Sequence, residues 1–182
     1  MMAHPKLPEW PIIDPNNPPS GYLEVACVMD PELTSAPWHF YVSGNHLLIV
    51  RKKWVQFDEN DPGEFVSGQY EYPIGAARWF LETLDRFFLE PDHPNAVPLG
   101  AITVEEDVDG ETLGVTRGAQ YGSVLKGIPG YSLDNLNRFE HTSFGPSTNW
   151  CQMFKMGDPW LFEHGLLDVF KDIAERHEQG EF

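Results

Sequence analysis

The sequence has little cysteine, few cations and no long apolar run, and each shortage excludes a class of protein. Its two cysteines, Cys27 and Cys151, are too few for a disulfide framework and have no CxxC spacing. No stretch approaches the roughly 18 apolar residues of a membrane span, and no basic-then-apolar leader is present. We therefore expect a cytoplasmic protein that does not associate with membranes and whose cysteines are reduced, structural thiols.

Cations are scarce relative to acids. The chain has 12 Lys and Arg against 28 Asp and Glu, which gives a formal net charge of -16. The excess is uneven, with five acids and four bases before Asp58, but 23 acids and eight bases from that residue onward. Such a field repels nucleic acid and anionic membranes over most of the surface, and it favours a basic partner.

The familiar catalytic and cofactor motifs are missing as well. The sequence contains no HExxH, no GxSxG and no phosphate-binding Gly-rich motif. His164 and Asp168 lie one helical turn apart and could be drawn as metal ligands, but a solvated polar helix face explains them equally. We therefore expect a protein that is not an enzyme and needs neither a cofactor nor a metal.

The hydrophobic pattern predicts an α+β protein. Residues 1–20 are rich in proline and predict an extended arm, followed by a single domain over residues 21–182. The stretches "WHFYV" and "HLLIVRKKWVQF" flank an "SGN" turn, and "AITVEED" and "ETLGVTRG" flank an Asp-Gly turn, so each pair predicts a β-hairpin. Apolar residues at helical spacing predict amphipathic helices within residues 74–90 and 157–178.

The order hairpin, further strand, helix occurs in residues 21–90 and again in residues 98–178. We therefore predict an antiparallel sheet with two amphipathic helices packed on one face. Two similar halves, each of strands followed by a helix, are one interpretation, and an unrelated pair of halves is the other. Unpaired edges on both half-sheets would favour a homodimer.

One set of candidate binding residues lies in the second half of the chain and in the first helix. The Gly-rich segment 114–131 predicts a long loop, with Arg117, Tyr121 and Tyr131 as its contacts. Trp79 falls outside the apolar stripe of its helix and would be an interface anchor. These residues favour a non-enzymatic acidic binding protein (an adaptor, a chaperone or an immunity-type inhibitor) that acts on a basic protein partner.

The alternative function depends on the cationic strand "RKKW". Arg51, Lys52 and Lys53 would contact phosphates while Trp54, with Tyr41 on the paired strand, would stack on bases, as single-stranded nucleic acid requires. Protection of a sheet edge by charge explains the same cations without a ligand. The repeated order of strands and helix, over roughly residues 21–177, resembles that of the Pur-alpha and Whirly single-stranded-DNA-binding proteins. The resemblance implies a nucleic-acid-binding sheet face that carries Arg51, Lys53 and Trp54.

Overall fold

The computed structural model describes residues 4–182 and has an eight-stranded, mostly antiparallel sheet with few helices. The predicted α+β class is therefore confirmed. The first four strands and their helix are β1 (Leu23–Val28), β2 (Trp38–Ser43), β3 (His46–Val55), β4 (Glu64–Pro73) and α1 (Ala76–Arg86). They are followed by β5 (Thr103–Val108), β6 (Glu111–Ser123), β7 (Ile128–Thr142), β8 (Gly145–Gly157), the π-helical turn η1 (Pro159–Glu163) and α2 (Leu166–Glu178).

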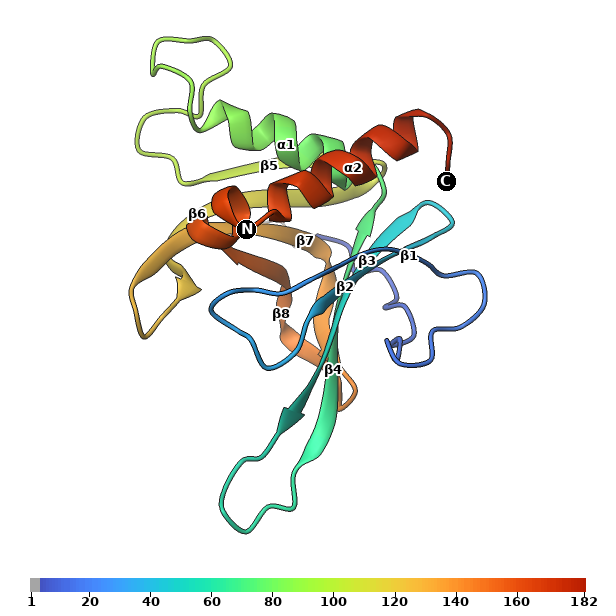
Figure 1. Cartoon of the computed structure of the whole chain (residues 1–182). Coiled ribbons are helices and arrows are strands. Elements are labelled where there is room, and N and C mark those ends of the chain that lie inside the picture. The colour runs from blue at the N-terminus through green and yellow to red at the C-terminus, as the bar shows by residue number, and fades with distance from the viewer. Residues whose placement is uncertain (1–3) are drawn as a thin grey trace.

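The long strand β7 joins the two parts of the sheet. The strand order is β1-β2-β3-β4-β7-β6-β5, and β8 also pairs with β7. Only two residue pairs, Gly68 with Thr142 and Gln69 with His141, connect β4 to β7. The β3–β4 hairpin projects away from the body of the molecule, on the side opposite the helices (Figure 1).

The predicted hairpin turns form as the sequence indicates. Gly44 begins the β2–β3 turn with a φ of 57°. Asp109 and Gly110 join β5 to β6 with φ values of 51° and 87°, the left-handed pair that a two-residue type I′ turn requires. These turns fix the pairing register of β2 with β3 and of β5 with β6.

The main core contains buried side chains of both helices and of the sheet. Phe80 of α1 and Phe170 of α2 are fully buried, with ring centroids 4.7 Å apart. Sheet residues such as Phe40, Leu47 and Ile49 belong to the same cluster. Burial of these apolar side chains supplies the main stabilisation of the fold.

The amino-terminal arm covers part of the other sheet face. Ile13 is 1% exposed and packs with Tyr41, Leu48 and Val50 in a second, smaller core. The Leu7 amide also donates a hydrogen bond of 2.8 Å to the Asn137 carbonyl. Proline has no backbone N–H, so the arm can form few strand-like hydrogen bonds. Hydrogen bonds with groups of the sheet anchor it instead.

The Gly-rich segment 114–131 is not the long loop that we predicted. It forms most of β6 and the beginning of β7, joined by a short turn. A Cβ atom at Gly130 would lie 2.0 Å from the Met156 carbonyl oxygen, and one at Gly122 would lie 2.7 Å from the Gly157 Cα. These glycines permit close packing of strand backbones. A sequence pattern does not distinguish glycines with this role from glycines in a flexible loop.

The carboxy-terminal helix also differs from its prediction. It is divided into η1 and α2 at Gly165, which has a φ of 85°. Asp158 lies at the N-cap of η1 but makes no capping hydrogen bond, and its carboxylate instead accepts two hydrogen bonds from Arg117. Phe162 of η1 is 43% exposed.

Across residues 4–182, no helix has the length and apolar character needed to span a bilayer.

Candidate functional site

Of the three consecutive cations, Arg51 is a buried structural residue. Its side chain is 7% exposed and donates to the carbonyls of Leu33 and Ala36, and to the Ser35 hydroxyl. Its guanidinium also lies 5.4 Å from the centre of the Trp38 ring. Arg51 therefore ties β3 to the loop before β2, and its hydrogen-bonding capacity is used inside the protein.

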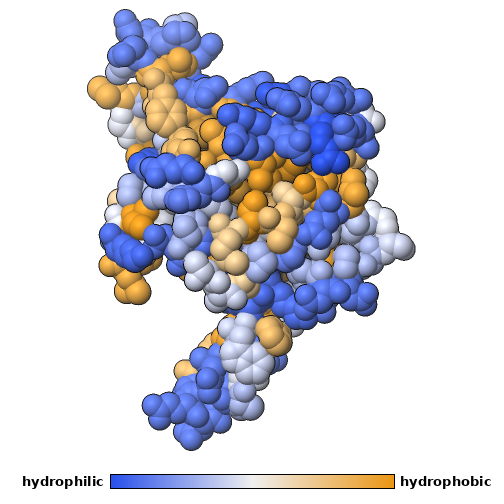
Figure 2. Space-filling view, in the orientation of Figure 1, coloured by the Kyte–Doolittle hydropathy of each residue, from blue (hydrophilic) through white to orange (hydrophobic). Residues whose placement is uncertain are grey.

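The other residues of this strand differ in exposure. Lys52 pairs with Asp14 of the arm at 2.8 Å, whereas Lys53 is exposed. Trp54 is 52% exposed and packs edge-to-face on Phe65 across the projecting β3–β4 hairpin. Figure 2 shows this projection as largely hydrophilic, with some hydrophobic atoms near its base.

Two further candidate residues are held by contacts within the protein. Tyr41 is fully buried beneath the arm, so its ring cannot stack on a ligand from this position. Trp79 is half-buried, and its indole Nε1 donates a hydrogen bond of 2.9 Å to Glu106. The structure therefore does not bring Tyr41 together with the exposed Trp54.

Arg117 and Tyr131 form one cluster, while Tyr121 lies elsewhere. Arg117 makes its two hydrogen bonds to Asp158 while its guanidinium lies 4.6 Å from the Tyr131 ring centre. Tyr131 is 4% exposed, so this cluster locks η1 against the sheet. Tyr121 lines a groove and lies 5.2 Å from the Lys155 ammonium.

This groove has a volume of about 930 Å³. Its floor includes Trp38 on β2, Tyr70 on β4 and Met153 on β8. The loop before β2 and the β6–β7 hairpin form its walls. Lys126 of the hairpin pairs with Glu32 of the loop at 2.6 Å, which links the two walls.

Exposed apolar side chains surround the groove. Leu33 is 46% exposed, Val124 71%, Leu125 100% and Trp150 69%, and all four line it. Hydrophobic atoms at the surface are visible along the edge of the molecule that carries the β6–β7 hairpin (Figure 2). Several exposed apolar side chains around one hollow are typical of a binding surface, whereas single exposed apolar residues are ordinary.

The charges that line the groove are mixed. Carboxylates come from Asp30, Glu32 and Glu140, and exposed cations from Lys53 and Lys155. Burial raises the pKa of the Asp30 carboxyl, which also accepts a hydrogen bond from the Glu32 amide. The groove can therefore pair with charges of either sign around an apolar centre.

A buried polar network lies near the junction of β4 and β7, and no sequence motif indicated it. The Glu71 carboxylate is fully buried and accepts hydrogen bonds from Gln69, Gln152 and His141. The side chain of Gln152 also accepts from the Glu71 amide. Glu71 and Gln69 alternate with Tyr70 and Tyr72 along β4, which is the pattern of a strand with one polar, solvent-facing side. Their burial therefore depends on residues outside β4 that pack over that polar side.

Glu111 extends this network toward the arm. Its carboxylate accepts two hydrogen bonds from Arg138, of 2.7 and 2.8 Å, and others from Asn135 and His46. Arg138 in turn donates to the Pro8 carbonyl. Burial alone would raise the pKa of Glu111, but the hydrogen bonds from Arg138, His46 and Asn135 lower it to about 2. Because these groups satisfy one another, the network fits a structural role.

Comparison with known proteins adds no relative. No family model, no curated protein and no solved structure matches this chain.

Proposed function

We propose that the protein is a non-enzymatic binding protein that receives an extended, basic polypeptide segment with an apolar anchor residue in the groove between the loop before β2 and the β6–β7 hairpin. The observation that carries this proposal is the ring of exposed Leu33, Val124, Leu125 and Trp150 around the groove. Apolar side chains in the centre of an interface commonly provide most of the binding energy.

The basic character of the partner is inferred from charge. The net charge of -16 would attract a basic chain from a distance, and Glu140 offers it an exposed carboxylate in the groove. Electrostatic attraction mainly raises the association rate, which then falls as salt is added. Adaptors, chaperones and immunity-type inhibitors all fit this description.

Fluorescence anisotropy with labelled peptide pools tests the proposal. One pool would contain Lys-rich, 12-residue peptides with one aromatic residue, and the matched pool would have Glu in place of Lys. We expect binding of the basic pool, with an affinity that falls with salt, and no binding of the acidic pool. Failure of every basic peptide to bind at low salt would contradict the proposal.

Two substitutions assign any binding to the groove. Leu125→Ser and Trp150→Ser together should weaken binding at least tenfold, because both side chains are exposed at the rim. Leu99→Ser is the matched control, since Leu99 is 92% exposed and does not line the groove. Equal affinities for the two variants would place the site elsewhere.

Single-stranded nucleic acid is a second candidate ligand, favoured by one arrangement in the same groove. Lys53 and Lys155 line it together with Tyr121 and Trp150, so cations and aromatic rings are adjacent. Labelled oligonucleotides tested across a salt series should then bind wild type, but not the Lys53→Gln/Lys155→Gln variant. Lys171→Gln on α2 is the control, and unchanged binding by the double variant would contradict this candidate.

We also infer three features of organisation. Two similar halves with both helices on one sheet face are supported by the order of four strands followed by a helix in each part of the chain. A homodimer is supported by β1 and β5, each of which pairs with one strand. A cytoplasmic location is supported by the free thiols of Cys27 and Cys151.

A further inference from the structure

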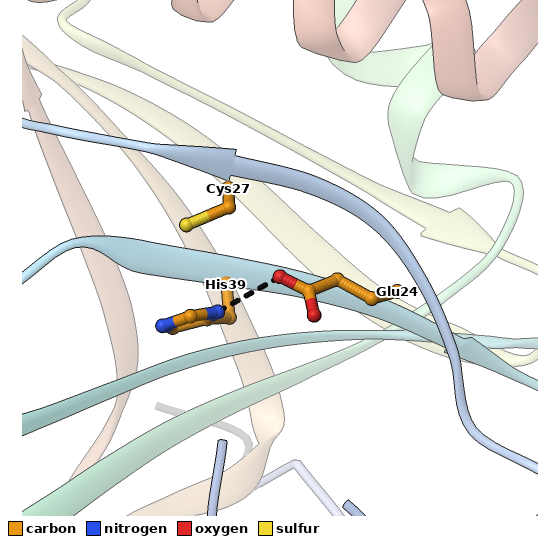
Figure 3. Close-up of side chains that lie close together, drawn as sticks. All are labelled: Glu24, Cys27 and His39. Atoms are coloured by element: carbon orange, nitrogen blue, oxygen red, sulfur yellow. Dashed lines mark hydrogen bonds and ion pairs between the residues drawn. The ribbon is translucent and has the colours of Figure 1, made fainter. Parts of the chain in front are cut away.

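Three potential metal ligands meet on the β1–β2 pair, away from the groove. The Glu24 carboxylate lies 2.9 Å from Nδ1 of His39, and the donor atoms of Glu24, Cys27 and His39 all lie within 4.8 Å of one another. Figure 3 shows the three side chains together, with Glu24 and Cys27 on β1 and His39 on β2.

A β-bulge creates this arrangement. Residues 24 and 27 are an odd number of positions apart, so in a regular strand their side chains would point to opposite faces. The register shifts between Glu24, which pairs with Tyr41, and Ala26, which pairs with Phe40. The extra residue restores a common face, so that Glu24 joins Cys27 and its direct cross-strand partner His39. Bulges that redirect a side chain in this way are common beside functional sites.

We propose that Glu24, Cys27 and His39 bind a divalent transition-metal ion, with Zn²⁺ as the best fit. Carboxylate oxygen, imidazole nitrogen and thiolate sulfur are all common zinc ligands, with bonds of about 2.0–2.3 Å. In a tetrahedral site such bonds separate the donor atoms by about 3.3–3.7 Å. Small side-chain rotations bring donors within 4.8 Å to that spacing, and a fourth position is left for water.

Tyr41 provides an independent observation that points to a ligand here. Its ring is fully buried and stacks against His39 at 6.3 Å, yet its hydroxyl has no hydrogen-bond partner within residues 4–182. A water on the metal would give this buried hydroxyl the partner that it lacks.

Cys27 is exposed, so its thiol is accessible to a metal ion in solution. A thiol that coordinates a metal loses its proton and binds as the thiolate. We therefore assign Cys27 as a ligand, in place of the inert structural thiol that the sequence indicated.

Cobalt(II) spectroscopy tests the site directly. Metal-free protein, reduced and treated with chelator, would be titrated with Co²⁺. We expect a thiolate-to-cobalt charge-transfer band that saturates at one equivalent and is displaced by Zn²⁺. Cys27→Ser should abolish the band, and His39→Gln should weaken Co²⁺ binding at least tenfold. Cys151→Ser is the matched control and should bind as wild type does.

Absence of the band in the wild type, or its survival in Cys27→Ser, would overturn the proposal. A second measurement remains decisive if Cys27→Ser does not fold. In the Cys151→Ser variant only Cys27 can react with a thiol reagent such as dithionitrobenzoate. Stoichiometric Zn²⁺ should slow that reaction at least tenfold, and an unchanged rate would exclude Cys27 as a ligand.

Discussion

At the scale of single residues, the buried carboxylates Glu111 and Asp134 respond to their surroundings in opposite directions. Glu111 accepts charge-assisted hydrogen bonds from Arg138, and its pKa falls to about 2. Asp134 is 5% exposed, with one oxygen bonded to Thr116 and the other without a partner in the described chain. Burial therefore raises the pKa of Asp134 to about 6. The first carboxylate stabilises the folded state at neutral pH, and the second destabilises it.

Glu111→Gln should lower the free energy of unfolding by about 3–5 kcal/mol at pH 7, because Arg138 would stay buried without its hydrogen-bonded anion and with Glu71, 3.9 Å away, as its remaining carboxylate. In the wild type, the stabilisation by ionised Glu111 is fully present above the unfolded-state pKa of 4.5 and is lost as pH falls toward about 2. The free energy of unfolding of the variant should therefore fall less steeply with pH over this range. Urea denaturation across pH measures both effects. Glu178→Gln, which removes the exposed partner of Arg78, should cost far less than Glu111→Gln, because solvent screens an exposed ion pair. Similar losses in the two variants would contradict this prediction.

Asp134→Asn should have the opposite effect. The pKa of Asp134 is higher in the folded state, so the wild type gains stability as pH falls from about 6 to 3.8. The variant has no carboxylate to ionise and should be more stable than wild type by about 2 kcal/mol at pH 7, but equal to it near pH 4. Urea denaturation at the two pH values measures this difference, and Asp168→Asn on exposed α2 should show none. A constant difference at both pH values would exclude ionisation as the cause.

At the scale of elements, the β6–β7 hairpin depends on glycines that permit close backbone contact. Gly130→Ala should lower the free energy of unfolding by at least about 2 kcal/mol, because its Cβ would collide with the Met156 carbonyl. Gly68→Ala is the control, since a Cβ there meets nothing within 4 Å, and its cost should stay below about 1 kcal/mol. Thermal and urea unfolding compare the two variants. A tolerated Gly130→Ala would show that the strands can separate without cost.

The elements that the sequence predicts are those whose signals are local. Alternation and turn residues predict the β2–β3 and β5–β6 hairpins, and helical spacing predicts α1 and α2. The residues that contact Gly130 and Glu71 are distant in sequence. From the sequence alone, a glycine that permits close packing of two strands therefore looks the same as one that makes a loop flexible, and a buried glutamate looks the same as an exposed one. Arg51 shows the same limit, because the loop that buries it lies some 15 residues earlier. The bulge that brings Glu24 to Cys27 likewise has no signature in the residues themselves.

At the scale of the whole molecule, a net charge of -16 opposes the compact state through self-repulsion. The urea midpoint should therefore rise as NaCl increases from about 10 to about 200 mM, where the Debye length falls below about 10 Å. KCl at equal ionic strength should give the same increase. A midpoint that falls with salt would show that attractive ion pairs, such as Arg78 with Glu178, outweigh the repulsion.

The anchoring of the arm also determines the order in which the chain can fold during synthesis. Pro5 and Pro8 are synthesised some 130 residues before Asn137 and Arg138, whose side chains donate hydrogen bonds to their carbonyls. At roughly 5–20 residues per second, the arm waits on the order of ten seconds for these partners. During that interval the arm's cover over Tyr41, Leu48 and Val50 is held by contacts within the first half, those of Ile13 with Gln69 and of Asp14 with Lys52. The arm therefore gains its full anchoring once β7 is complete.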